Sequence, residues 1–313
     1  MSLNCKKPED VLKLLKDDEI NFVDLRFTDP RGKWQHLTMT SEFIDDDSFT
    51  DGIMFDGSSI AGWKAINESD MSLIPDPTTA VMDPFAAQPA MILVCDIMEP
   101  TTGQPYGRDP RSLARKGEAY LGSTGTGDTA YFGPEAEFFI FDDVRFEVSM
   151  NSCFYKFESD EGPYVSGKIM EEGNTGHRPP VKGGYFPVPP VDSGNDLRAE
   201  MVTVMKEMGL NMDKHHHEVA PSQAELGLTF APLVRCADNL QIYKYVTHMV
   251  AHTYGKTATF MPKPVAGDNG SGMHVHQSIW KDGKPTFAGS GYADLSDAAL
   301  HYIGGIMKHA RSL

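Results

Sequence analysis

The chain has 313 residues, 40% of them hydrophobic and 10% aromatic, so it can bury a sizeable core and is long enough for two domains. Its 44 acidic and 28 basic side chains give a formal charge of −16, which would repel a phosphate backbone and argues against a nucleic-acid-binding protein. Its 4 cysteines form no CxxC pair, so the sequence indicates neither a disulfide framework nor a zinc ribbon and favours a reducing compartment.

The first part of the chain predicts a helix, a hairpin and a long strand. Residues 1–20 have the pattern of a charged amphipathic helix rather than of a signal peptide, and no apolar run is long enough to span a membrane, so we expect a cytoplasmic protein. Residues 20–40 alternate apolar and polar side chains around an Asp-Pro-Arg-Gly turn, which is typical of a hairpin. Residues 91–98 are extended and precede a turn-rich segment, so we place a domain boundary between residues 103 and 104.

The second part predicts helices and strands around one irregular stretch. A helix begins near Ser112 and leads into an apolar, aromatic strand over residues 131–146. Residues 159–190 are polar, rich in Gly and Pro and without clear periodicity, and long irregular stretches are often functional. Further on we expect helices over 196–208 and 234–254 and a strand over 257–264. Residues 294–313 have an amphipathic helical pattern without a terminal signal, so we expect the chain to be a fragment.

A pair of acids in the apolar strand is the first candidate site. Glu135 and Glu137 lie two residues apart, so the pleat aims both carboxylates at one face, with Cα atoms roughly 6.5 Å apart. A solvent-facing strand edge is the alternative, but the aromatic and aliphatic residues after Glu137 indicate burial, and buried acids need partners. The pair is therefore a candidate metal site.

The second candidate is a run of three histidines that ends at Glu218, followed by Glu225. In a strand, His216 and Glu218 share one face while His215 and His217 share the other, so only part of the run can serve one site. The alternative is a solvated histidine patch.

The third candidate combines a loop of small residues from Gly270 with the pair His274 and His276. In a strand the two imidazoles lie on one face, after a loop whose backbone can approach a ligand closely, although such pairs also occur in protein cores. Together with the glutamates they form an oxygen-rich ligand set, which Mg²⁺ or Mn²⁺ prefers and Zn²⁺ does not. Two such ions bridged by substrate oxygens are usual in phosphoryl transfer.

Several segments resemble class I glutamine synthetases, in the order that the family has them: MFDGSSIAGWKAINESDM, FGPEAEFFIFDDVRF, KGGYFPVPPVD, HHHEVAPSQAELG, KTATFMPKP and GDNGSGMHVHQS. The resemblance covers essentially the whole chain. It implies an α+β protein with an N-terminal β-grasp domain over residues 1–103. Residues 104–313 would form the glutamine synthetase catalytic domain, a curved antiparallel sheet flanked by helices, without its C-terminal part.

This resemblance also implies a reaction, cofactors and an assembly. The reaction is ATP-dependent ligation of ammonia to L-glutamate, giving L-glutamine, ADP and phosphate through γ-glutamyl phosphate. Two divalent cations, Mg²⁺ or Mn²⁺, are the expected cofactors, and ATP is the co-substrate. The expected assembly is a dodecamer of two hexameric rings with active sites shared between subunits. Neither nucleic acid nor a membrane is an expected partner.

Roles for individual residues follow from the same resemblance. Glu137, Glu218 and Glu225 would hold one cation, and Glu135 and His274 would hold the second.

The resemblance assigns the remaining site residues to the substrates. Asn269 and Gly270 would contact glutamate, where loop glycines permit close approach. Asp56 and Asp70 would bind and deprotonate ammonium for a neighbouring subunit. The residues expected at the nucleotide are Asp213, Tyr185, Phe230, His276 and Ser278.

Some parts of the family's machinery would lie after residue 313: the arginines that clamp phosphate and glutamate, the last metal ligand, the flap and the tyrosine modified by adenylylation. We therefore expect this chain alone to have little synthetase activity. The alternatives are a ligase that joins glutamate to another amine and a non-catalytic relative used for binding or assembly. The intact set of acids favours an enzyme, because a binding protein has no physical need for paired buried acids.

Overall fold

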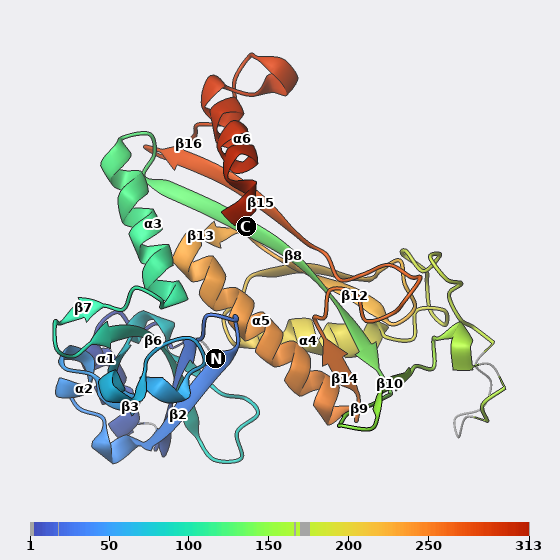
Figure 1. Cartoon of the computed structure of the whole chain (residues 1–313), viewed down its shortest axis with the longest axis horizontal. Helices are drawn as coiled ribbons and strands as arrows, with labels where there is room; N and C mark the ends of the chain where they lie inside the picture. The colour runs from blue at the N-terminus through green and yellow to red at the C-terminus, as the bar shows by residue number, and fades with distance from the viewer. Residues whose placement is uncertain (1–2, 18, 166, 170–175, 313) are drawn as a thin grey trace. The chain divides into compact units, whose positions relative to one another are not determined.

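The computed structural model describes residues 3–17, 19–165, 167–169 and 176–312. These residues form two compact units, whose elements are labelled in Figure 1. Unit 1 consists of Met1–Gly133, Phe230–Asp238 and His276–Leu313, and unit 2 consists of Pro134–Thr229 and Asn239–Val275. None of the helices in the described part of the chain combines the length and the apolar composition of a membrane span.

A mixed sheet forms the N-terminal part of unit 1. Its strands are β1 (Phe22–Thr28), β2 (Trp34–Thr40), β3 (Ile53–Asp56), β4 (Asp70–Pro75), β5 (Val81–Met82), β6 (Ala90–Glu99) and β7 (Gln104–Pro105). The main path is β2-β1-β6-β4-β3, and β5 and β7 also pair with β6. β1 is antiparallel to β2 and parallel to β6, so the predicted hairpin is confirmed. Most side chains of β1 and β6 are buried, as expected for central strands covered on both faces.

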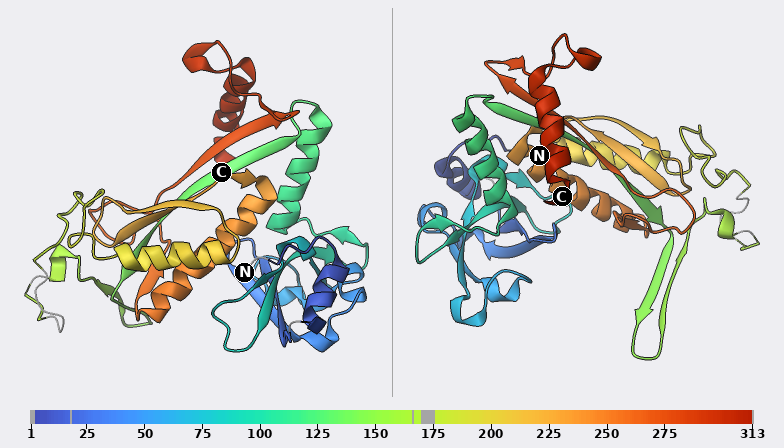
Figure 2. Two further views of the ribbon diagram at one scale, coloured as in Figure 1. Left: turned by 180° about the vertical axis from the view of Figure 1, so that it is seen from behind. Right: turned by 45° about the horizontal axis from the view of Figure 1, so that its top comes forward.

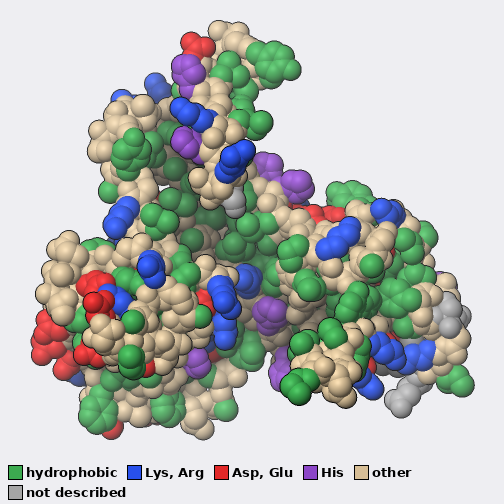
Figure 3. All heavy atoms as spheres, in the orientation of Figure 1, with side chains coloured by type: hydrophobic (Ala, Val, Ile, Leu, Met, Phe, Trp, Pro, Cys, Tyr) green, Lys and Arg blue, Asp and Glu red, His purple; other side chains and the backbone are tan. Residues whose placement is uncertain are grey.

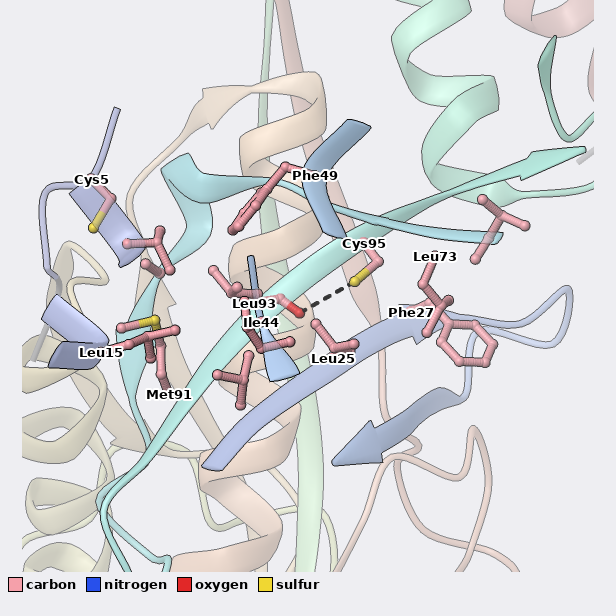
Figure 4. Close-up of a cluster of buried hydrophobic side chains, with 14 of the residues drawn as sticks. Cys5, Leu15, Leu25, Phe27, Ile44, Phe49, Leu73, Met91, Leu93 and Cys95 are labelled. Carbon is pink, nitrogen blue, oxygen red and sulfur yellow. Dashed lines mark hydrogen bonds between the residues drawn. The ribbon is translucent and has the colours of Figure 1, made fainter. Parts of the chain in front are cut away.

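The core of this sheet packs against the helix α1 (Pro8–Asp17), which confirms the predicted N-terminal helix. Figure 4 shows the apolar cluster, in which Leu15 of α1 lies with Leu25 of β1 and Leu93 of β6. Burial of such side chains is the main favourable term in folding, roughly 25 cal/mol for each Å² of apolar surface removed from water. The cluster therefore holds the central strands β1 and β6, beside which lie β4 and then the edge strand β3.

Unit 1 contains three further α-helices: α2 (Asp47–Thr50), between β2 and β3, and, later in the chain, α3 (Pro110–Thr124) and α6 (Asp297–His309). α3 begins where predicted, because the side chain of Asp109 accepts hydrogen bonds from the N–H groups of Arg111 and Ser112, and Pro110 stands at the first helical position. The helix ends at Gly125, whose φ of 68° is left-handed. Figure 3 shows acidic side chains gathered near α2 and β7, in keeping with the net charge.

Unit 2 is built on a second sheet and two helices. Its elements are β9 (Asp143–Val148), β10 (Cys153–Glu158), α4 (Asn195–Glu207), β11 (Met212–His217), β12 (Gln223–Leu228) and β14 (Thr257–Thr259). Other elements have residues in both units or belong to unit 1: β8 (Thr129–Phe141), β13 (Ala231–Pro232), α5 (Leu233–Thr253), β15 (Met273–Lys281) and β16 (Lys284–Pro285). The strand order is β11-β12-β8-β15-β16, and β13 and β14 also pair with β8. β9 and β10 form a separate two-stranded hairpin, light green in Figure 2.

Two strand predictions were too long. The strand expected over residues 131–146 is interrupted at Asp142, and the chain continues in the hairpin β9-β10. The strand expected over residues 257–264 pairs only through β14, which ends at Thr259. Pro262 and Pro264, further on, have no N–H to donate to a ladder.

Candidate metal centre

One histidine and two glutamates of unit 2 lie in a row across three neighbouring strands. His216 of β11 is directly opposite Glu225 of β12, and Glu225 is directly opposite Glu137 of β8. Residues directly opposite in antiparallel strands point to the same face, with Cβ atoms roughly 5 Å apart. Glu218 follows the end of β11, two residues after His216. The strand pairing therefore brings together acids that are far apart in the sequence.

Three of these side chains are close enough to share one ion. Ligand atoms of His216, Glu218 and Glu225 all lie within 4.8 Å of one another, and no other such group occurs among the residues that the structure describes. Nδ1 of His216 is 3.5 Å from Oε1 of Glu218, and its Nε2 is 3.6 Å from Oε1 of Glu225. Both carboxylates are buried. Oxygen ligands with an imidazole suit a hard divalent cation, so the donor set fits Mg²⁺ or Mn²⁺.

The pKa values of the group reflect this crowding. Burial, followed by the charge of Glu137, raises the pKa of Glu218. The neighbouring imidazole of His216 lowers the pKa of Glu225, and the Glu225 carboxylate in turn raises the pKa of His216. The acids thus depend on a nearby positive charge, and the imidazolium and a bound cation are alternative sources of that charge.

Glu137 is held by contacts of its own. Its Oε2 accepts hydrogen bonds from Nε2 of Gln223 at 2.6 Å and from the N–H of Gly272 at 3.0 Å. The same Gln223 nitrogen donates to the carbonyl of Gly270 at 2.8 Å. The loop containing Asn269 and Gly270 is therefore tied directly to a predicted metal ligand.

Sequence reasoning did not single out His216 or Gln223 as members of the site. The sequence feature that could have indicated both residues is their spacing. His216 precedes Glu218 by two residues and Gln223 precedes Glu225 by two, and residues two apart in a strand share a face. The face shared by His216 and Glu218 was predicted and is confirmed by the geometry.

The predicted ligands Glu135 and His274, like Glu137, lie outside the group of three. Glu135 is half-buried on β8, two residues before Glu137, whereas His274 is exposed on β15. After the larger effect of His216, the charge of His274 also helps to lower the pKa of Glu225. Their role as ligands of a second ion stays a prediction.

The opposite face of β11 presents a buried ion pair. Nε2 of His217 is 2.9 Å from Oε2 of Glu161, and its Nδ1 is 2.6 Å from the carbonyl oxygen of Glu218. Burial opposes ionisation of Glu161, but hydrogen bonds from His217, Ser193 and Ser222 outweigh it and lower the pKa of Glu161 to about 2. The pair lines a cavity of about 420 Å³ in unit 2.

Two of the residues expected at the nucleotide belong to unit 2. Tyr185 is exposed and stacks on Phe186 with ring centroids 3.9 Å apart, and its ring centroid is 5.8 Å from that of His216. Asp213 is exposed at an irregularity in β11, where the register with β12 shifts between Met212 and Lys214.

The other residues expected at the nucleotide belong to unit 1. A Cβ at Gly133 would lie 3.3 Å from Cβ of Phe230 and 3.8 Å from Cβ of His276. The side chains of Phe230 and His276 therefore both lie next to Gly133. Ser278 accepts a hydrogen bond from Nε1 of Trp280 at 3.1 Å and lines a cavity of about 320 Å³.

Asp56 and Asp70 lie directly opposite each other on β3 and β4 of unit 1. Asp56 is exposed, and it accepts hydrogen bonds from the N–H of Ser58 at 2.8 Å and from the hydroxyls of Ser58 and Ser59, both at 2.6 Å. These bonds, of which the Ser58 hydroxyl contributes most, lower the pKa of Asp56. The sequence thus places a fixed negative charge at the surface of unit 1.

Comparison with known proteins identifies related sequences over nearly all of the chain. The family model described as "Glutamine synthetase, beta-Grasp domain" matches residues 19–100, and "Glutamine synthetase, catalytic domain" matches residues 107–313. Glutamine synthetase of Azospirillum brasilense is 67% identical over 97% of this chain. The 3-hydroxylaminophenol mutase of Cupriavidus pinatubonensis is 59% identical, also over 97%. The chain spans 65% of the length of each of these two relatives.

A solved structure shows the same fold. The cryo-EM structure of Plasmodium falciparum glutamine synthetase matches 99% of this chain, with a TM-score of 0.91 and 27% sequence identity, over 61% of its own length. The expected fold class, a β-grasp domain followed by a catalytic domain with a curved sheet and helices, is confirmed.

Proposed function

Because the chain belongs to the glutamine synthetase family, we propose that it takes part in ATP-dependent ligation of ammonia to L-glutamate, giving L-glutamine, ADP and phosphate. The observation that supports this most directly is the row of His216, Glu225 and Glu137 across β11, β12 and β8, with Glu218 beside it. Acids buried side by side cost free energy unless a cation compensates them. We also place the division of the chain into domains between residues 103 and 104.

Two divalent cations, Mg²⁺ or Mn²⁺, fit the donor set. Glu137, Glu218 and Glu225 would hold one, and Glu135 and His274 the other. When bound, such ions neutralise charge on the phosphoryl oxygens that pass from ATP to the side-chain carboxylate of glutamate.

The loop at Asn269 and Gly270 acts on glutamate, and two acids of β3 and β4 act on ammonium. The amide of Asn269 and the backbone at Gly270 orient glutamate through directional hydrogen bonds. Asp56 attracts ammonium and accepts its proton as ammonia attacks γ-glutamyl phosphate, while Asp70 adds negative charge beside it. In a dodecamer of two hexameric rings, these two acids serve the site of a neighbouring subunit.

The nucleotide is expected to meet aromatic rings from loops and polar groups from β11 and β15. Tyr185 and Phe230 are exposed aromatics that offer a face or an edge to adenine. Asp213, His276 and Ser278 provide hydrogen-bonding groups for the ribose, phosphates and base.

A chimera tests the proposed reaction. Residues 1–313 of this protein are joined to the part of the Azospirillum brasilense relative that the match does not cover, and glutamine and ADP are measured. We expect both products only when glutamate, ammonium and Mg²⁺ are all present. Glu225→Gln should abolish the reaction, and Glu42→Gln, at an exposed acid of unit 1, should leave it unchanged. The 313-residue chain alone is expected to form little product.

Other outcomes would contradict the proposal. A folded chimera that binds Mg²⁺ and forms no glutamine indicates a binding or assembly role. Product formation with another amine in place of ammonium indicates a related ligase. Because a relative that is 59% identical has another enzyme name, the assay must identify glutamine itself rather than follow ADP alone.

A further inference from the structure

Gln223 contacts three separate parts of the acidic site in unit 2. Its Nε2 donates to Oε2 of Glu137 at 2.6 Å and to the carbonyl of Gly270 at 2.8 Å. Its Oε1 accepts a hydrogen bond from the N–H of Ala220 at 3.0 Å. Its backbone carbonyl accepts one from the N–H of Glu218 at 2.8 Å. The side chain is 1% exposed, so water cannot replace these partners.

The contacts allow only one orientation of the amide. A primary amide has two N–H donors and one carbonyl acceptor. In Gln223 both donors face acceptors, the carboxylate of Glu137 and the carbonyl of Gly270, while the oxygen faces the N–H of Ala220. If the amide were flipped, its oxygen would face Oε2 of Glu137 and the carbonyl oxygen of Gly270, and the N–H of Ala220 would lose its acceptor. Leaving buried polar groups without partners costs free energy. The side chain is therefore locked in place.

We infer that Gln223 is a positioning residue that couples the cation-binding carboxylate of Glu137 to the glutamate-binding loop at Gly270. This inference rests on the proposed function for the roles of those two residues. One amide bonds both partners at once, so a change in the position or charge of the Glu137 carboxylate reaches the loop through a single rigid group. Gly272 reinforces the connection, because it both donates to Oε2 of Glu137 and accepts from its N–H, each at 3.0 Å.

The coupling predicts that a cation alone stabilises the loop. In the whole chain, amide hydrogen exchange of Gly270 and Ser271 is measured with and without Mg²⁺. We expect Mg²⁺ to slow exchange about tenfold in the wild type, the effect of one hydrogen bond to a charged group. In Gln223→Met, which keeps the side-chain length but cannot donate, the effect at Gly270 and Ser271 should fall below about twofold, because the cation site no longer has the amide that joins Glu137 to Gly270. Gly272 bonds Glu137 directly and should keep its response.

A matched control removes a similar bond elsewhere. Nε2 of Gln35 donates to Oδ2 of Asp29 at 3.1 Å in unit 1, so Gln35→Met also deletes an amide-to-carboxylate hydrogen bond. This variant should keep the wild-type response of the loop to Mg²⁺. Equal slowing of exchange in Gln223→Met and in the wild type would overturn the coupling.

A second measurement needs no variant and remains decisive if Gln223→Met does not fold. The side-chain amide resonances of Gln223 in the wild type should shift when Mg²⁺ is added, and unshifted resonances would overturn the inference. The two proposals fail differently. If the chimera makes no glutamine but its loop responds to Mg²⁺, the proposed reaction is contradicted. If the chimera makes glutamine but its loop does not respond to Mg²⁺, the coupling is contradicted.

Discussion

Arg111 donates two parallel hydrogen bonds to Asp238, from Nε to Oδ1 at 3.0 Å and from Nη2 to Oδ2 at 2.9 Å. The same guanidinium donates to Asp96 and Asp76, both at 2.7 Å. Burial alone would lower the pKa of Arg111, but these carboxylates outweigh it and raise the pKa. One buried cation therefore joins three acids from separate segments of unit 1.

Replacing Arg111 by alanine should destabilise unit 1 by about 3–5 kcal/mol, because buried carboxylates would lose their partner. Arg115 is the control: it also contacts Asp76 and Asp96, but its side chain is 45% exposed. Arg115→Ala should therefore cost about 0–1 kcal/mol. Urea unfolding of both variants measures the difference, and equal losses would show that burial does not decide the strength of this network.

Acid should weaken the same network through Asp76. Burial would raise the pKa of Asp76, but hydrogen bonds from Thr78 and Arg111 outweigh it and lower the pKa to about 2. The pKa of an unfolded aspartate is about 3.9, so the folded state binds the proton more weakly. The resulting stabilisation is complete above about pH 5 and is lost as the pH falls toward about 2.

The matching variant is Asp76→Asn. At pH 7 it should be less stable than the wild type by about 2 kcal/mol, and at pH 3 by about half of that. Free energies of unfolding at the two pH values provide the comparison. A difference that does not change between pH 7 and pH 3 would contradict an ionised Asp76 in the folded protein.

Gly272 leaves room for the carboxylate of Glu137. A Cβ at residue 272 would lie 3.0 Å from Oε1 and 3.4 Å from Cδ of Glu137. Gly272→Ala should displace this carboxylate and weaken Mn²⁺ binding about tenfold, or about 1.4 kcal/mol. A Cβ at Gly107 would meet nothing within 4 Å, so Gly107→Ala should bind Mn²⁺ as the wild type does. An electron paramagnetic resonance titration measures both, and an unaltered Gly272→Ala would exclude Glu137 as a ligand.

Asp56 should determine the ammonium requirement of the active chimera. Asp56→Ala removes a carboxylate whose charge is maintained by Ser58 and Ser59, so the KM for ammonium should rise about tenfold or more. The KM for glutamate should change little. Glu68→Ala, at an exposed acid in the same segment, is the control. Unchanged ammonium kinetics in Asp56→Ala would remove this residue from the proposed role.

Local features of the fold could be predicted from the sequence because neighbouring residues determine them. The Asp109 cap and Gly125 define α3, and the spacing of Glu135 and Glu137 defines their common face. The position of Glu225 between His216 and Glu137 could not be predicted in this way. It depends on which strands pair, and nothing in a short stretch of sequence states that β12 lies between β11 and β8.

The bridging contacts of Gln223 were hidden for the same reason. Its partners Glu137 and Gly270 are far from it in the sequence, and its spacing from Glu225 predicts a shared strand face but not which residues it bonds. At residues 257–264 the sequence has an extended pattern, but only Thr257–Thr259 pair with β8, which a local pattern does not reveal.

The continuity of β8 limits how this protein can evolve. The candidate metal ligands Glu135 and Glu137 both lie in this one strand, and Glu137 is held in register opposite Glu225. Inserting or deleting one residue between Glu135 and Glu137 would turn one of the carboxylates to the other side of the sheet. The segment can therefore diverge by replacement but not by change of length. Residues 149–152, at the exposed tip of the hairpin β9-β10, have no such constraint and are the natural place to graft a tag or a reporter sequence.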